Sequence, residues 1–439
     1  MPDGAAGRQF EYVLRQIAAS RDGTAHTDRS RFEAGAMPEL DVALRPLVAR
    51  MAARFGSFEV ASVEARTEFA LVADLEASDG KKWRVSCRVE ETPPHRIVAL
   101  DWERVLDFDV VVREAVEADA PALAEIERRC PLLLGDSSTV IDRGDDYFAF
   151  ARLMEDVTVS FGLIDGQPAG INCGALRTAR IDGIDRRIMV AVHTRILPEH
   201  QGKGLWGALS RLLSKKYSPS RGVAGSIGYG SVDNAAIQRG FANVPEKWDP
   251  GPVRAHLACS SDAGSGIGSV ATPADAPRIV ELINACHSGE EMYTPYTVES
   301  LSARLERSPE QYSWNHVRLM ENAVVGVWSA GDTIRVITEK NGQHVESRRG
   351  VVLDYGFVPS DDGGGVGEAE LSALLCGWYA RLEKRGMDTL TVFSSRASPG
   401  YQTIRALAKQ TEAFYAWTPG IAVPQRLPEA GMYVDAIYF

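Results

Sequence analysis

The sequence lacks an uninterrupted apolar run of about 18 residues, the length that a membrane-spanning helix requires. The first residues, MPDGAAGRQFEYVLRQ, lack the basic stretch followed by an apolar stretch that marks a secretory signal. The 6 cysteines stand singly, without a C-x-x-C pair or a Cys/His cluster of zinc-ligand spacing. We therefore expect a cytoplasmic protein with reduced cysteines, no membrane association and no bound metal.

Positive charge is also scarce. The chain has 48 Lys and Arg residues against 59 Asp and Glu residues, which gives a formal net charge of −11. Nonspecific binding to a phosphate backbone requires a basic surface, so nucleic acid is not an expected partner. The acidic balance mildly favours a cationic or amine partner.

The sequence is long enough for several hydrophobic cores. Its 439 residues, at about 150 per domain, predict roughly three domains. The first is expected over 1–106. Residues 8–20 and 38–55 repeat apolar side chains at helical spacing, and 57–65, 68–77, 82–90 and 96–105 alternate like strands of an antiparallel meander. This small helix-plus-antiparallel-sheet domain resembles the cystatin and NTF2-like families in architecture.

The rest of the chain contains an internal duplication. The word Ala-Asp-Ala-Pro occurs at 118–121 and again at 274–277, each time before an amphipathic segment, and a glycine-rich stretch follows both Pro198 and Pro359. Two matches in the same order with nearly equal offsets indicate repeated units. The Gly/Ser-rich stretch 260–269 is typical of a linker, so the units are predicted at 107–262 and 263–439.

The segment most informative about chemistry lies in the first copy. Residues 188–197, IMVAVHTRIL, predict a buried strand that ends at Pro198, and Gln201-Gly202-Lys203-Gly204 opens a helix. A strand that leads through a glycine-rich turn into a helix N-terminus forms an anion site. Unpaired backbone amides converge there, and the helix dipole adds roughly half a positive charge.

The order strand, proline, then Gln201-x-x-Gly204 at a helix start resembles the coenzyme A pyrophosphate motif of the GCN5-related N-acetyltransferases (GNATs). Over residues 110–258 the expected strands and helices, with Asn234 and Gly240-Phe241 near the end, follow the order of that family. Trp206 departs from it, because the family has a small residue there. The resemblance implies an α+β fold with two tandem GNAT-like lobes, mixed sheets flanked by helices, after the small domain. It assigns coenzyme A contacts to Ile196, Leu197, Gln201, Gly202, Lys203, Gly204, Leu205, Trp206 and Asn234.

The resemblance also implies an activity: transfer of an acyl group from acetyl-CoA or another acyl-CoA to an amine by direct attack, without a covalent enzyme intermediate and without metal. The acceptor would be a small-molecule or peptide amine. Candidate catalytic residues are His193, Tyr229 and Asp233. Strand alternation places Val192 and Thr194 on one face and His193 on the other, which favours a buried core histidine. The family's general-acid tyrosine is absent from NAAIQRGF at 234–241, which fits a water-relayed base or prior deprotonation.

The second copy carries an altered motif. Asp361, Asp362 and Glu368 surround the position that a pyrophosphate would take, and like charges would weaken phosphate binding. We expect this lobe not to bind coenzyme A, and to act as a structural partner or as a wall of the acceptor pocket. Aromatic residues of 288–318 could line such a pocket or pack in a core, and core packing is favoured.

Two alternatives to N-acetyl transfer remain. The same fold could use a longer-chain acyl-CoA or an acyl carrier protein thioester. The only indication of such a donor is Trp206, at a position where the family has a small residue. The lobes could instead form a non-catalytic module that binds coenzyme A or a metabolite. The sequence leaves the acceptor, and whether the chain forms a homodimer, open.

Overall fold

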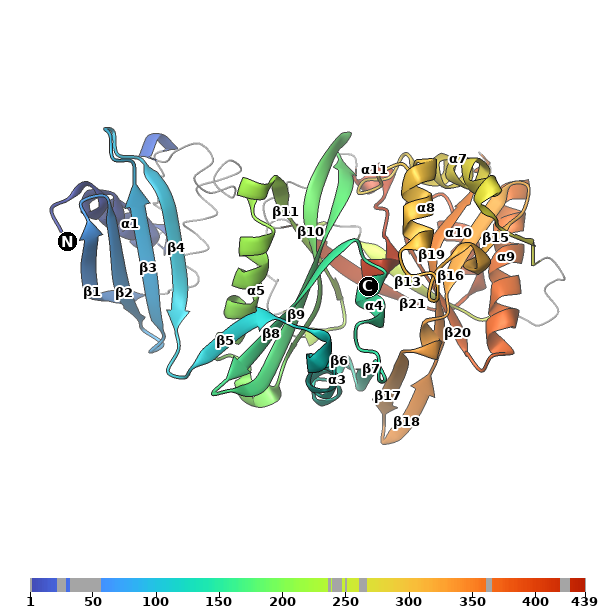
Figure 1. Ribbon diagram of the computed structural model, residues 1–439, viewed down its shortest axis with the longest axis horizontal. Helices are drawn as coiled ribbons and strands as arrows, with labels where there is room; N and C mark the ends of the chain where they lie inside the picture. Colours follow the sequence, from blue (N-terminus) through green and yellow to red (C-terminus); the bar gives the residue numbers. More distant parts are fainter. Residues whose placement is uncertain are drawn as a thin grey trace.

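The computed structural model describes residues 2–21, 29–31, 57–235, 238, 247–248, 251–259, 267–360, 365–418 and 427–438. Figure 1 shows three parts in a row: a small N-terminal unit, a central lobe and a C-terminal lobe. The expected helix 38–55, Gly240-Phe241 and the Asp361-Asp362 pair lie outside the described residues.

The N-terminal unit is one helix packed on a four-stranded antiparallel meander. Strands β2 and β3 alternate buried and exposed residues, so one face of the sheet meets the helix while the other meets solvent. The predicted strands form at the predicted places, and the helix over 8–20 also forms. The elements are α1 (Ala5–Arg21), β1 (Phe58–Thr67), β2 (Ala70–Ala77), β3 (Lys82–Val89) and β4 (Ile97–Val105).

The two lobes share one large mixed sheet. Within the described residues, 13 strands form it, in the order β14-β15-β16-β19-β20-β13-β21-β11-β10-β9-β8-β5, with β12 paired to β21. The central-lobe strands are β5 (Val110–Glu114), β8 (Asp156–Ile164), β9 (Gln167–Ile181), β10 (Ile184–Ile196), β11 (Val223–Ser231), β12 (Lys247–Trp248) and β13 (Pro252–Leu257). The C-terminal-lobe strands are β14 (Ser269–Val270), β15 (Val317–Leu319), β16 (Ala323–Trp328), β19 (Arg349–Phe357), β20 (Thr389–Ser395) and β21 (Ala408–Trp417).

The lobes exchange strands where they meet. Strand β13, the last strand of the central lobe, lies between β20 and β21 of the C-terminal lobe, and β21 in turn pairs with β11 of the central lobe. Each lobe therefore completes the sheet of the other. The exchange is a long-range pairing that local sequence patterns do not report.

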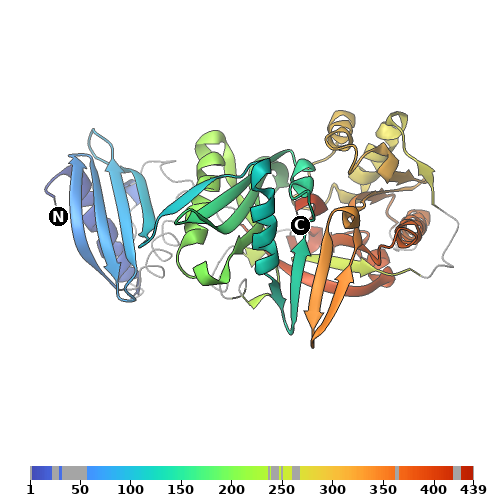
Figure 2. The ribbon, with the colours of Figure 1, turned by 60° about the horizontal axis from the view of Figure 1, so that its bottom comes forward.

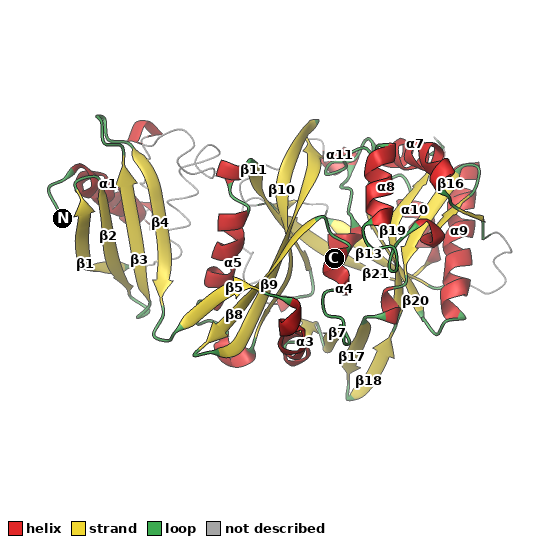
Figure 3. Cartoon of the chain, viewed as in Figure 1, coloured by secondary structure: helices red, strands yellow, loops and turns green. Residues whose placement is uncertain are grey.

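Helices cover both faces of this sheet. The repeated Ala-Asp-Ala-Pro words open α3 and α7 in the same way, with proline in the first turn, which confirms the predicted duplication at this point. In Figure 3, helix α5 lies between the N-terminal sheet and the central sheet. The helices are α3 (Ala120–Arg129), α4 (Ala149–Arg152), α5 (Leu205–Lys216), α7 (Ala276–His287), α8 (Val298–Glu306), α9 (Val366–Glu383), α10 (Tyr401–Leu407) and α11 (Leu427–Ala430).

A second, four-stranded sheet also joins the lobes. A hairpin from each lobe contributes two strands, in the order β18-β17-β7-β6, and Figure 2 brings these hairpins to the front. The strands are β6 (Leu132–Leu134), β7 (Ser137–Asp142), β17 (Arg335–Lys340) and β18 (Gln343–Ser347).

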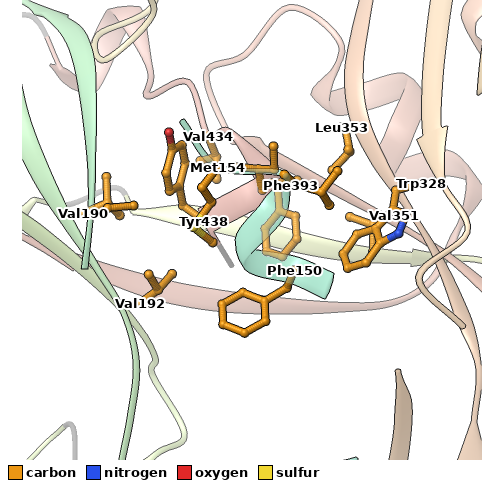
Figure 4. Close-up of a cluster of buried hydrophobic side chains, with 14 of the residues drawn as sticks. Phe150, Met154, Val190, Val192, Trp328, Val351, Leu353, Phe393, Val434 and Tyr438 are labelled. Atoms are coloured by element: carbon orange, nitrogen blue, oxygen red, sulfur yellow. The ribbon is translucent and has the colours of Figure 1, made fainter. Parts of the chain in front are cut away.

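The largest buried cluster spans the joint between the lobes. Phe150 and Val192 of the central lobe belong to it together with Trp328, Phe393 and Tyr438 of the C-terminal lobe (Figure 4). Because apolar burial is continuous across the joint, the two lobes form one folding core.

One expectation about cysteine is wrong. Cys259 and Cys376 are joined in a disulfide, while Cys87, Cys130, Cys173 and Cys286 are buried free thiols. The bonded residues are 117 positions apart and meet because the chain leaves β13 against α9, a proximity that sequence spacing does not reveal. In the part of the chain that the structure describes, no helix is both long and apolar enough to cross a membrane.

Candidate functional site

The central feature of the first lobe is an opening between two neighbouring strands. Strands β10 and β11 run parallel and pair only as far as Ala191 and Gly228, although β10 continues to Ile196 and β11 to Ser231. Beyond that point β11 pairs with β21 on its other side. The two strands therefore diverge, and within the described residues the edge of β10 that faces β11 has no strand partner there.

The glycine-rich loop lies at the end of β10, where Pro198–His200 form one 3-10 turn and α5 begins at Leu205. Gly202 and Gly204 have φ values of 71° and 97°, a conformation that residues with a Cβ rarely adopt. Among the described residues, the backbone N–H groups of Gly202, Gly204, Leu205 and Trp206 have no hydrogen-bond acceptor. The loop thus presents the set of donors that an anion needs at a helix start.

The other residues of the loop that were predicted to contact coenzyme A differ in hydrogen bonding and in exposure to solvent. Gln201 Nε2 donates to Ile196 O at 3.1 Å, and Leu197 N donates to Ala169 O at 3.0 Å, so these main-chain groups are already engaged. Lys203 is exposed, and Trp206 is 47% exposed. The loop is therefore accessible, except at Leu205, the first residue of α5, whose side chain is fully buried.

The N-terminal unit contacts this loop directly. Arg104 of β4 donates from Nη1 to Gly202 O at 2.6 Å. A Cβ on Gly204 would lie 2.9 Å from Leu106 Cδ2 and 3.0 Å from Arg104 Cδ. Arg104 could not be placed at the loop from the sequence, because the contact spans 98 residues and joins two separate units.

A β-bulge at His193 changes the predicted facing of β10. Val192 lies opposite Cys173 and Thr194 opposite Asn172, which leaves His193 as the extra residue. Val192 is in the buried cluster of the lobe joint, whereas Thr194 Oγ1 donates to Asn172 Oδ1. The prediction that Val192 and Thr194 share a face is therefore wrong, because the bulge interrupts simple alternation.

His193 lies in a buried polar cluster on the α4 side. Arg143 Nη2 is 2.6 Å from its Nε2, and the Phe150 ring packs edge-on at a centroid distance of 4.7 Å. Glu127, 1% exposed, forms ion pairs with both Arg143 and Arg195. Burial, and then the charges of the two arginines, hold the pKa of His193 well below its usual value, so the imidazole is neutral at pH 7.

Tyr229 is the first β11 residue beyond the last pair with β10. Burial raises its pKa to about 12, although the nearby charge of Arg177 acts in the opposite direction. Its phenol therefore stays protonated at neutral pH. Asp233 is exposed just after β11, and Asn234 forms an isolated bridge with Leu134. The structure thus brings Tyr229 to the opening and leaves Asp233 at its outer end.

At the start of α9, the corresponding place in the C-terminal lobe, the described residues include a carboxylate of the protein itself. Glu368, in the first turn of α9, accepts hydrogen bonds from Ser360 N at 2.9 Å and from Ser360 Oγ at 3.0 Å, and its side chain is buried. A Cβ on Gly367 would lie 2.3 Å from Val358 O. A carboxylate of the protein therefore takes the place at the helix start that an anionic ligand would need.

The aromatic residues expected near the second lobe's acceptor side pack in its core. Tyr296 and Tyr312 donate to the Asp354 carboxylate at 2.9 and 2.7 Å. Arg304 bridges Asp354 and Asp435 at 2.9 Å each. Tyr293 and Tyr312, 2% and 1% exposed, fit the core interpretation, whereas Tyr296 and Trp314 are partly buried against the same cluster.

Solved structures of other proteins share the fold of this chain. No protein-family profile and no curated protein sequence matches the chain. A crystal structure of Saccharomyces cerevisiae N-myristoyltransferase with bound myristoyl-CoA superposes with a TM-score of 0.52 at 9% identity, covering 76% of this chain and 82% of that one. The chain has a tandem GNAT-like fold.

A second structure of that enzyme, with bound myristoyl-CoA and inhibitors, gives a TM-score of 0.51 at 10% identity and covers 79% of this chain and 87% of that one. The expected fold of two tandem lobes is therefore confirmed. At such low identity the likeness concerns the arrangement of the chain and not the residues of the site.

Proposed function

We propose that the protein is an N-acyltransferase that moves an acyl group, most simply acetyl, from acyl-CoA to an amine. The observation that carries the proposal is the combination of diverging β10 and β11 strands with an amide-lined glycine loop at the end of β10. The unpaired strand edge suits the amide groups of a pantetheine arm, and the loop suits a diphosphate. The solved N-myristoyltransferase structures of similar fold hold myristoyl-CoA, which supports the same class of donor.

The reaction needs three things from this chain: alignment of amine and thioester, stabilisation of the oxyanion and protonation of the leaving thiolate. The amine nitrogen attacks the thioester carbonyl carbon, the carbon–sulfur bond breaks, and the sulfur must gain a proton. We assign that proton to Tyr229, which is adjacent to the opening and carries its proton at neutral pH.

We assign His193 a positioning role. Its imidazole is neutral and contacts Arg143, which can only donate hydrogen bonds, so a lone pair of the ring is engaged. The cluster of Glu127, Arg143 and Arg195 holds the bulge in β10 at the opening. The substrate ammonium would then lose its proton to water, either through a water relay or before binding, with Asp233 at the outer end of β11 as the available carboxylate.

A donor series tests the acyl group. Purified protein is incubated with a panel of small-molecule and peptide amines and with acyl-CoA thioesters of increasing chain length, and free thiol is measured. We expect amine-dependent thiol release with acetyl-CoA, which falls with longer chains. Highest turnover with long chains or with an acyl carrier protein thioester would instead support the longer-donor alternative. Tight binding without turnover across the panel would support a non-catalytic binding module.

A further inference from the structure

The N-terminal unit reaches the glycine loop with a charged side chain. Strand β4 ends against the start of α5, and Arg104 Nη1 donates to Gly202 O at 2.6 Å. The same edge is held by an ion pair between Glu103 of β4 and Arg211 of α5. A cation from one unit is thus fixed within the loop of another.

The charges around the loop favour an anion. Three carboxylates near the loop or Arg104 are each paired with a cation of their own: Glu199 with Arg129 at 2.6 Å, Glu103 with Arg211, and Asp79, on which the charge of Arg104 also acts, with Lys81. Arg104 and Lys203, in contrast, form no ion pair within the described ranges. The Nε and Nη2 groups of Arg104 also lack a hydrogen-bond acceptor among the described residues. These donors are therefore left for an anionic ligand, whose two oxygens a guanidinium can bind at once.

We propose that Arg104 binds the diphosphate of acyl-CoA, so that the N-terminal unit supplies a ligand-binding residue to the central lobe. This inference rests on the proposed function, because it concerns the same loop. It gives the N-terminal unit a defined task, which is to complete the phosphate site, and makes donor affinity depend on the contact between β4 and α5.

Calorimetric titration of the full chain tests this role. The probes are acetyl-CoA, dephospho-CoA, which keeps the diphosphate but lacks the 3′-phosphate, and S-acetylpantetheine, which has no phosphate. Arg104→Ala should weaken binding of the first two about ten- to hundred-fold, the range for a charge-assisted hydrogen bond. Its affinity for S-acetylpantetheine should equal that of the wild type. The salt dependence of acetyl-CoA binding should also become weaker.

Three further variants distinguish two roles of Arg104: binding the ligand through its charge, and supporting the loop through its hydrogen bond to Gly202 O. Arg104→Lys should retain most of the affinity, whereas Arg104→Gln, which can still donate to Gly202 O, should lose as much as Arg104→Ala. Arg66→Ala, which breaks an exposed ion pair with Glu64 on β1, at the far edge of the same sheet from β4, should change affinity less than about threefold.

Several results would overturn the inference. Wild-type affinity in Arg104→Gln would mean that the side chain only supports the loop, and tighter binding by Arg104→Ala would mean that it blocks the site. If the wild-type chain binds acetyl-CoA but Arg104→Ala is unchanged, Arg104 has no role and the proposed function stands. If the wild-type chain binds no acyl-CoA, the proposed function itself fails.

Discussion

The two lobes share an architecture but differ where each long helix begins. In the central lobe, α5 starts with open amides on two glycines of positive φ, and Arg104 stands beside them. In the C-terminal lobe, α9 starts with Glu368 folded back onto Ser360. The same helix-dipole position is left for an external anion in one lobe and filled by an internal carboxylate in the other.

The two lobes also differ in the residues at the point where two parallel strands diverge. Strands β19 and β20 also diverge, after Val351 and Thr391. The first residue of β20 beyond the last pair is Val392, which is 1% exposed. The residue at the same position of β11 is Tyr229. At the position that matches Tyr229, the C-terminal lobe therefore has a buried valine, and at the start of α9 it has a carboxylate of its own. The two lobes therefore share a fold, and the open amides on which the proposed function rests lie in the central lobe.

The largest expected effect comes from blocking the open loop. Gly204→Val places a branched side chain at φ 97° and against Leu106 and Arg104. We expect acetyl-CoA affinity to fall by at least about a hundredfold by calorimetry, since the amides can no longer converge. Gly207→Ala, on the same helix with nothing within 4 Å of the added Cβ, is the matched control. Equal affinities in the two variants would contradict the assigned site.

The next effect tests the proton donor. Tyr229→Phe removes the hydroxyl that stays protonated because its pKa is raised to about 12. We expect kcat to fall about ten- to hundred-fold while the Kd for acetyl-CoA changes little, because the loop is untouched. Steady-state kinetics and calorimetry check the two quantities. An unchanged kcat would remove Tyr229 from the reaction and leave water as the proton source.

The next effect is on stability and concerns Glu368 of the C-terminal lobe. Glu368→Ala removes two hydrogen bonds to a buried carboxylate and should lower the free energy of unfolding by about 1–3 kcal/mol in denaturant titration. Glu383→Ala, at an exposed position on the same helix, should change it by less than about 0.5 kcal/mol. We expect no second acetyl-CoA site in Glu368→Ala, because Gly367 lies against Val358 O. A second site there would contradict the account of this lobe.

A smaller, pH-dependent effect tests the strand exchange. Burial tends to raise the pKa of Glu412 on β21, but the hydrogen bond from His256 and the charge of Arg254, both on β13, outweigh it and bring the pKa to about 2. Because the folded pKa lies below the usual 4.5, this stabilisation is full above about pH 4.5 and is lost as the pH falls towards 2.

Glu412→Gln should therefore lower the unfolding free energy by up to about 3 kcal/mol at pH 7, and the difference from wild type should shrink as the acid range is entered. Denaturant titrations of both proteins at several pH values measure it. A difference that is independent of pH would mean that the Glu412 charge does not stabilise the joined strands.

Local patterns in the sequence predict much of the difference between the two lobes. The glycines after Pro198, the paired Ala-Asp-Ala-Pro words and the carboxylate at Glu368 all act through neighbouring backbone, so the loop, the duplication and the altered second copy could be predicted. What could not be predicted depends on tertiary contact or on one irregular residue. Arg104 reaches the loop from another unit, β13 pairs inside the other lobe, and the bulge at His193 reverses the facing that alternation implies.

The most direct test of the central claim is the stoichiometry of acetyl-CoA binding to the full chain, measured by calorimetry on wild type and Gly204→Val. We expect one site per chain in the wild type and none in the variant. Two sites per chain, a single site that survives in Gly204→Val, or no binding of any acyl-CoA would contradict it.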